Sequence, residues 1–316
     1  MQTIRDVLER FQAPIYFAAV AVAAVFATTV EGTQNWESAI NPALALMLYV
    51  TFLQMPLSVR ASAIPSMRFL VALLVTNFVA IPLLVLALSH WLPSDQMLRF
   101  GVLLVLLAPC IDYVVTFAYM GKADTRLLLA ATPVLLVVQM LLLPLYMGAI
   151  LGREAAALVQ LQPFVHAFVW LIALPLLLAA LTQRWAARTA LGARLQAGLG
   201  LLPVPATAMV LFVVMAVVVP QLDAAREVAK AVLPVYVAFA VLAPLVGWWM
   251  AKAFRLPAEA GRAVAFSAGT RNSLVVLPLA LAVPGALPVL PAVIVTQTLT
   301  ELLSELVYIK LAPKLR

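Results

Sequence analysis

The chain has 316 residues, of which 65% are hydrophobic and only 10% are charged, and its formal net charge is +7. A water-soluble domain of this length could not bury so much apolar surface, so the composition excludes a soluble protein and places the chain in lipid. The single cysteine excludes an intramolecular disulfide and any cysteine-rich metal site.

Apolar stretches that can cross a hydrocarbon core of about 30 Å, which takes about 20 helical residues, recur along the whole chain. Continuous runs such as Phe78 to Leu88 exclude the alternating pattern of a membrane β-barrel, so the predicted fold is all-α. The first stretch is longer than the apolar part of a signal peptide, and we expect it to remain in the protein. The ten predicted transmembrane helices are residues 14–31, 38–57, 66–92, 98–120, 126–151, 161–183, 199–220, 231–252, 262–284 and 287–310.

The basic residues are distributed unevenly between the two sides of this predicted topology. With a cytoplasmic N-terminus, 15 of the 20 Lys and Arg residues lie in the inner loops or at the inner ends of the spans, and 4 lie on the outer side. Cytoplasmic loops of membrane proteins carry such an excess. The positive charge therefore indicates an inner-membrane protein with both termini in the cytoplasm, and nucleic acid is not an expected partner.

The fifth predicted helix resembles the tenth in sequence. Residues 133–139 read Pro-Val-Leu-Leu-Val-Val-Gln, and residues 291–297, half a chain length later, read Pro-Ala-Val-Ile-Val-Thr-Gln. The same offset superposes Cys110 on Ala268, and a similar one superposes 81–83 on 243–245. Because five helices per half is an odd number, the second half enters the membrane from the opposite side. We therefore predict a 5+5 inverted repeat of residues 1–158 and 159–316.

Predicted helices four and nine each carry an irregular segment near mid-span. Residues 107–113 contain a proline and an aspartate, and residues 267–273 contain glycine, arginine and several hydrogen-bonding groups. Both helices should break there. Paired broken helices in the two halves of a membrane protein indicate a binding site near the midplane.

Four charged residues lie within the predicted spans away from the terminal positions, where each is costly and suggests function. Asp112 begins the second half of helix four, where the helix dipole favours an anion. Arg271 lies at the matching point of helix nine, where the dipole disfavours a cation, so Asp112 or an anionic solute group should compensate it. Glu301 is a candidate for the cavity or for carrying a proton. Glu305 is expected to snorkel to the cytoplasmic interface.

Uncharged side chains near the breaks have two interpretations each. Cys110 is a small buried hydrophobe or a soft ligand for a thiophilic solute such as trivalent arsenic. The polar residues line the cavity or hydrogen-bond between helices, and for the two glutamines packing is favoured. No hydrolase, metalloprotease or prenyltransferase motif occurs, so we expect neither an enzyme nor a cofactor or metal. The polar candidates are Asn77, Thr132, Thr270, Asn272, Gln139 and Gln297.

At these residues the chain resembles the bile acid:sodium symporter superfamily, and most closely its arsenite efflux permeases. Ala108-Pro109-Cys110 is similar to the fourth-helix motif of the permeases, which a lysine and an aspartate follow in the next loop. The other similar positions are Lys122, Asp124, Asn77 before Phe78, Asn272 and Glu301. The resemblance implies a panel domain of helices one, two, six and seven and a core domain of the others. The broken helices cross in the core, and transport is by alternating access.

The chain also departs from these families. Leu274 stands where the permeases have a glutamate, and Val114, Val115, Ser267 and Arg271 stand where the sodium-coupled members have sodium ligands. We interpret the guanidinium of Arg271, which stays protonated in proteins, as occupying the region of a coupling cation. Sodium coupling is therefore not expected. Proton coupling through Asp112 or Glu301 and uncoupled transport both remain open.

The resulting hypothesis is a secondary transporter in the lipid bilayer that exports arsenite or a related small solute. Cys110 would contact the arsenic atom, and Asp112 with Arg271 would set the charge. The alternatives are a carrier of small organic anions, with Arg271 clamping a carboxylate, and a membrane receptor that binds without transport. The residues that would hydrogen-bond the solute are Asn77, Thr270 and Asn272, with Thr132 in the same cavity.

Overall fold

The computed structural model describes residues 2–54, 66–111, 113–156 and 161–315, is 85% helix, and has no strand in these ranges. The boundary predicted between the two halves, at residues 158 and 159, lies outside the described residues. The helices of the first half are α1 (Gln2–Arg10), α2 (Gln12–Thr29), α3 (Glu37–Phe52), α4 (Met67–Val75), α5 (Ile81–Leu88), α6 (Gln96–Leu106), α7 (Val114–Met120) and α8 (Thr125–Ala156). The helices of the second half are α9 (Leu161–Phe168), α10 (Leu174–Ala186), α11 (Ala190–Leu199), α12 (Pro203–Val218), α13 (Leu222–Ala253), α14 (Ala258–Gly269), α15 (Ser273–Leu281) and α16 (Val289–Leu311).

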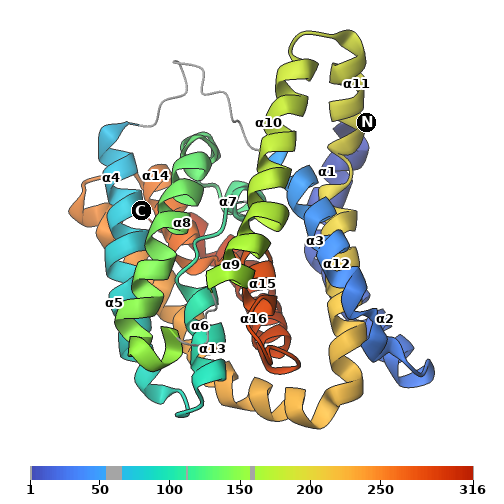
Figure 1. The fold of residues 1–316 in the computed structure, drawn as a ribbon. Coiled ribbons are helices and arrows are strands. Elements are labelled where there is room, and N and C mark those ends of the chain that lie inside the picture. The colour runs from blue at the N-terminus through green and yellow to red at the C-terminus, as the bar shows by residue number, and fades with distance from the viewer. Residues whose placement is uncertain (1, 55–65, 112, 157–160, 316) are drawn as a thin grey trace.

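Among the described residues, six helices are long and apolar enough to cross a membrane, and the bent pair α11 and α12 makes a seventh candidate. Within the described residues, each predicted span overlaps one helix or consecutive helices of the structure. The sequence prediction missed α1 and α11 as separate elements. The helix α11 forms a hairpin with α10 that projects at the top of Figure 1.

Two of the membrane helices contain a π-helical turn that precedes a proline. The turn Thr76–Ala80 joins α4 to α5 ahead of Pro82, and the turn Val169–Ala173 joins α9 to α10 ahead of Pro175. Proline lacks an N–H and its ring clashes with the preceding turn, so the helix widens there instead of continuing regularly. Single π-helical turns of this kind interrupt the regular hydrogen bonding of an α-helix and are frequent at functional sites.

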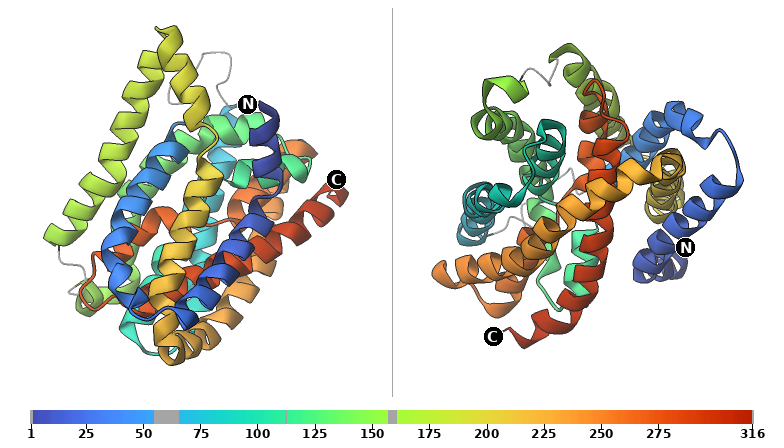
Figure 2. Two further views of the ribbon diagram at one scale, coloured as in Figure 1. Left: turned by 90° about the vertical axis from the view of Figure 1, so that its right-hand side faces the viewer. Right: turned by 90° about the horizontal axis from the view of Figure 1, so that it is seen from below.

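The helices form two packed groups. In one, α2 and α3 pack against α12, and α3 also packs against α10; in the other, α13 packs against α14 and α16, and α6 packs against α8 and α16. The right-hand view of Figure 2 shows α2 and α12 on one side of the molecule, and α13 leading from them to the second group.

The breaks of the fourth and ninth predicted helices lie against each other inside the second group. The segment between α6 and α7 meets the segment between α14 and α15 in an antiparallel bridge of Pro109 with Arg271. The N–H of Cys110 donates to the carbonyl of Thr270 at 3.1 Å, and the N–H of Asn272 donates to the carbonyl of Ala108 at 2.7 Å. This crossing of broken helices satisfies backbone groups that lipid could not satisfy.

Two tyrosines make matching interhelical hydrogen bonds. Tyr146 on α8 donates to the carbonyl of Phe78, and Tyr308 on α16 donates to the carbonyl of Ala240 on α13; each bond joins residues 68 apart in the chain. The tyrosines are 162 residues apart, since 308 − 146 = 162, and so are the two carbonyl residues. Pro109 and Arg271, paired at the crossing, have the same separation, since 271 − 109 = 162.

Candidate functional site

Arg271 is fully buried at the crossing, and its guanidinium is held by oxygen atoms. Its Nη2 lies 2.9 Å from Oδ1 of Asn77, 2.5 Å from the carbonyl of Ser267 and 2.8 Å from that of Ala268. Its Nη1 lies 3.3 Å from the carbonyl of Leu106. Its Cζ lies over the ring of Phe239, 5.5 Å from the ring centre, a cation–π contact. The cation is therefore enclosed by neutral acceptors and an aromatic ring.

The direction of this side chain corrects the prediction that the helix dipole disfavours Arg271. The residue precedes α15, but its guanidinium turns back to carbonyls at the C-terminal ends of α6 and α14. The C-terminal end of a helix carries a partial negative charge and favours a cation. The side chain therefore places its charge at two helix ends that stabilise it.

Glu301 occupies the opposite side of the same residue. Its Oε2 accepts the backbone N–H of Arg271 at 2.6 Å and the Nε2 of Gln297 at 2.6 Å, and its Oε1 accepts the hydroxyl of Tyr113 at 2.5 Å. Three donors satisfy a buried carboxylate well. The prediction that Glu301 reaches the region of the breaks is confirmed by these contacts.

Asn77 connects the π-helical turn between α4 and α5 to the crossing. It lies in the π-helical turn, where its Oδ1 accepts from Arg271 and its Nδ2 donates to Oγ of Ser267 at 3.0 Å and to the carbonyl of Leu73 at 3.1 Å. Both ends of the amide are thus used. The side chain fixes where the guanidinium lies.

Glu305 does not snorkel, contrary to the prediction. Its side chain is fully buried, and its Oε1 is hydrogen-bonded to the hydroxyl of Thr270, a residue of the crossing. Burial follows from the helical spacing, since Glu305 lies one turn beyond Glu301 on the same face of α16. Thr270, predicted as a solute ligand, is instead bonded to protein oxygens in this conformation.

The remaining candidates are distributed around this cluster. Cys110 lies in the crossing with a fully buried side chain, next to the bridge of Pro109. Asn272 is also buried, and within the described residues its Nδ2 has no hydrogen-bond partner. Thr132 donates to the carbonyl of Leu129 in its own helix at 2.8 Å, which does not bring it to the cluster. Asp112, and with it the predicted pairing to Arg271, lies outside the described residues.

The lysine and aspartate of the loop after α7 lie away from the cluster. The carboxylate of Asp124 accepts the N–H groups of Arg126 and Leu127 at 3.1 and 3.3 Å and so caps the start of α8. The carbonyl of Lys122 accepts from Nε of Arg262 at 2.8 Å. These contacts give both positions a structural role.

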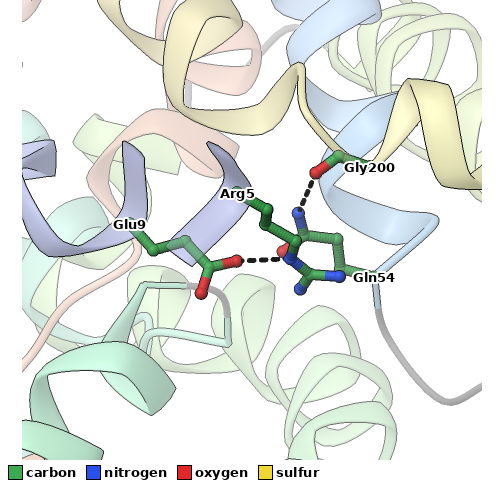
Figure 3. A network of polar contacts seen from close by, with 4 residues as sticks. All are labelled: Arg5, Glu9, Gln54 and Gly200. Carbon is green, nitrogen blue, oxygen red and sulfur yellow. Dashed lines mark hydrogen bonds and ion pairs between the residues drawn. The ribbon is translucent and has the colours of Figure 1, made fainter. Parts of the chain in front are cut away.

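A polar crevice reaches the cluster from the N-terminal side. Tyr113, which binds Glu301, also lines this crevice together with residues of α1, α2, α3 and α12. Figure 3 shows its rim, where Arg5 pairs with Glu9 at 2.6 Å and Gln54 donates to the carbonyl of Gly200 at 3.4 Å. The crevice lies between the two helix groups and meets the cluster at Tyr113.

Sequence reasoning missed three parts of the site. Gln297 was assigned to packing, but its spacing of four residues from Glu301 on one helix was the available signal. Tyr113 and Ser267 lie within the segments predicted to break, and Ser267 also stands where sodium-coupled members have a sodium ligand, but the sequence did not predict their contacts with Glu301 and Arg271. Among the described residues, no group of three or more His, Cys, Asp or Glu side chains could hold a metal ion.

Comparison with known proteins identifies the family. No curated protein matches the chain. The model of the Sodium Bile acid symporter family matches residues 41–228, which is more than half of the chain and includes the first break and the π-helical turn with Asn77. Members of this family are transporters rather than enzymes, and the apolar helices fit a protein that crosses the membrane several times. The chain therefore belongs to the sodium bile acid symporter family and is a membrane transporter of a small solute.

Proposed function

We propose that this transporter moves a small neutral solute of the arsenite type, by alternating access and without sodium. The observation that carries the proposal is the position of the Arg271 guanidinium, which lies among the oxygen atoms of Asn77, Ser267, Ala268 and Leu106. In carriers with broken helices, unwound carbonyls and helix C-terminal ends are the groups that bind coupling cations. Here a permanent cation of the protein occupies such a set of groups.

The same contacts bear on the charge of the solute. Four protein oxygens engage Nη1 and Nη2 of the guanidinium, and its Nε, which has no partner among the described residues, is buried, so no two-donor face is open to clamp a carboxylate; this weighs against the organic anion alternative. Its charge is balanced by the buried Glu301, whose carboxylate lies on the backbone N–H of Arg271. A site that is already neutral favours a neutral solute, and arsenous acid is neutral near pH 7.

Cys110 and Asn272 are the residues that we assign to this solute. They follow the two residues paired at the crossing, and both are buried in this conformation. A thiolate is the protein ligand that trivalent arsenic prefers, and the amide of Asn272 provides a donor for a hydroxyl group. Rocking of the two helix groups would open the crevice at Tyr113 and expose them.

We further propose ten membrane crossings as an inverted repeat, in the inner membrane, with both termini in the cytoplasm. The support is the common separation of 162 residues shared by the two tyrosine hydrogen bonds and by the bridge at the crossing. The same separation relates the sequence match of 81–83 with 243–245, whereas the match of 133–139 with 291–297 has a separation of 158. A separation of 162 residues between equivalent positions therefore describes the repeat better than one of 158 residues.

Counterflow in proteoliposomes tests the solute and the ion together. Vesicles loaded with unlabelled arsenite are expected to take up labelled arsenite at the same rate in sodium and in potassium buffer. Cys110→Ser should abolish this uptake, while Cys110→Ala distinguishes loss of the thiol from loss of a space-filling group. Exchange of small carboxylates that is insensitive to Cys110→Ser would overturn the arsenite proposal, and uptake only in sodium buffer would overturn the sodium-independent one.

A matched variant sharpens the sodium test. Arg271→Met removes the cation and leaves its oxygen ligands in place, so any residual uptake of this variant is expected to depend on sodium or another small cation. Equal uptake by the variant in all buffers would contradict the assignment of these oxygens as a cation site. Melting temperatures of the purified variants in detergent show whether each one is folded.

A further inference from the structure

The second buried carboxyl group of α16, Glu305, is not accounted for by a cation or by solute binding. Its side chain has no exposed surface, and its Oε1 contacts Thr270 while its Oε2 has no hydrogen-bond partner within the described residues. An ionised carboxylate with a single hydrogen bond is strongly unfavourable in such surroundings. The environment therefore favours the neutral acid.

The number of hydrogen-bond donors between Thr270 and Glu305 also favours a protonated Glu305. The hydroxyl oxygen of Thr270 is within hydrogen-bond distance of the carbonyl of Phe266, at 2.7 Å, and also of Oε1 of Glu305. A hydroxyl has one hydrogen and a carbonyl has none, so Thr270 can donate to only one of these two oxygens. Unless the single hydrogen is shared between the two acceptors, both bonds form at full strength when Glu305 carries a proton and donates it to Thr270.

Glu301, one turn earlier, has the opposite environment. Its Oε2 accepts from two N–H donors, the backbone of Arg271 and the side chain of Gln297, and its Oε1 contacts the hydroxyl of Tyr113, which is closer to Glu301, at 2.5 Å, than to the carbonyl of Arg271, at 3.3 Å. Glu301 therefore needs no proton to satisfy its oxygens. Arg271 supplies one positive charge, which balances one carboxylate. Two neighbouring carboxyl groups in a low dielectric do not both ionise readily, so the proton belongs on the group with fewer donors.

The charged and titratable groups around Glu305, among the described residues, come from two elements, α16 and the segment between α14 and α15. Glu301 and Tyr308 lie on its own helix, and the hydroxyl of Tyr308 is used by the carbonyl of Ala240 on α13. Arg271 lies at the crossing with its guanidinium directed to Leu106 and Asn77. The guanidinium of Arg271 is therefore bonded to these acceptors and not to Glu305.

We propose that Glu305 is a proton-binding site and that its proton is the one exchanged during transport, an inference that rests on the proposed transport function. Thr270 connects the site to the moving part, because its carbonyl accepts the N–H of Cys110 in the crossing. When the crossing shifts and water reaches Glu305, the carboxyl releases H⁺ to that side. In the opposite conformation it takes one H⁺ from the other side. The role predicted for Asp112 or Glu301 is thereby assigned to Glu305.

Infrared spectroscopy of the reconstituted full-length protein tests the proton directly. The wild type should show the carbonyl band of a buried protonated acid, which Glu305→Gln removes and Glu301→Gln retains. Thr270→Val should shift this band, and Thr270→Ser should leave it in place. A spectrum unchanged by Glu305→Gln would overturn the proposal.

Transport measurements test the coupling. With one proton exchanged per solute, a gradient of one pH unit supports about tenfold solute accumulation at zero membrane potential. Glu305→Gln should still exchange solute at equal concentrations but lose this accumulation, while Glu259→Gln, an exposed carboxyl on α14, should retain it. Wild-type accumulation by Glu305→Gln would overturn the coupling. If no solute moves but Glu305→Gln still removes the band, the proposed function fails and the proton site stands.

Discussion

Glu301 binds Arg271 at the backbone, not at the guanidinium. Its Oε2 accepts the N–H of Arg271 at 2.6 Å, whereas the guanidinium of the same residue points away to Leu106, Ser267 and Ala268. The carboxylate thus lies near the N-terminal end of α15, and the cation lies at the C-terminal ends of α6 and α14. Each charge complements a helix dipole, so the crossing stabilises both without direct pairing.

Removing the guanidinium should destabilise the protein strongly. Arg271→Met leaves four acceptors without a donor and Glu301 without a compensating charge, and we expect a loss of about 3–5 kcal/mol, the range for one partner of a buried charged network. Arg271→Lys keeps the positive charge and should lose less stability than Arg271→Met. Denaturant unfolding in detergent micelles measures both variants, and equal stability of the two would contradict the role of the charge.

Tyr113 should contribute through its hydroxyl group. Tyr113→Phe removes the donor to Glu301 and is expected to cost about 1.5–3 kcal/mol, as for hydrogen bonds to charged groups. Tyr119→Phe on α7, the helix that Tyr113 precedes, is the control, because Tyr119 is 74% exposed and the variant should lose no more than about 0.5 kcal/mol of stability. Unfolding measurements that give the two variants the same stability would rule out the bond to Glu301 as a stabilising contact.

The sequence indicated the helices and the breaks, because long apolar runs cross lipid as helices and polar residues at mid-span are too costly to lie there without partners. It did not indicate where long side chains point. Arg271 precedes a helix in the sequence, yet its flexible chain reaches the ends of two other helices, and only the folded crossing brings these ends together.

Glu305 and Asn77 illustrate a second limit of the sequence. Because Glu305 lies near the end of a predicted span, the sequence suggested that its side chain reaches water. In the structure the side chain instead contacts Thr270. Which face of a helix is buried depends on the neighbouring helices. Asn77 was predicted as a site residue, but its two contacts, to Arg271 and Ser267, join positions about 190 residues apart. Such distant pairs cannot be derived from local patterns.

The two tyrosine hydrogen bonds should behave as equivalent contacts of two repeats. Tyr146→Phe and Tyr308→Phe each remove one donor to a carbonyl of a neighbouring helix, and we expect each to cost about 0.5–1.5 kcal/mol. Their effects should add in the double variant to within about 0.5 kcal/mol, because the bonds share no partner. A large loss for one variant and none for the other would argue against equivalent roles.

Cys110 provides a direct probe of the crossing, since it is the only cysteine of the chain. Its side chain is fully buried, so a maleimide should react with the folded protein far more slowly than with protein unfolded in detergent. Conformations that open the crossing should raise the rate. Labelling of the folded protein as fast as that of the unfolded protein would contradict the closed arrangement.

Close packing behind the crossing gives the last prediction. A Cβ atom at Gly247 on α13 would lie 2.7 Å from Cβ of Ala268, 2.8 Å from Cα of Ala265 and 2.9 Å from the carbonyl oxygen of Val264. None of these atoms is the end of a flexible side chain, so Gly247→Ala must move α14 and is expected to cost about 1–3 kcal/mol. Because the carbonyl of Ala268 holds Arg271, the variant should also impair transport.

Gly148→Ala on α8 is the matched control, since a Cβ atom there meets nothing within 4 Å. It should be neutral or stabilising by about 0.5–1 kcal/mol, because alanine favours the helix over glycine. Unfolding and solute uptake measured on both variants separate the close contact from the general effect of replacing glycine. If Gly247→Ala behaved like Gly148→Ala in both assays, α13 and α14 would not be packed as closely as these distances require.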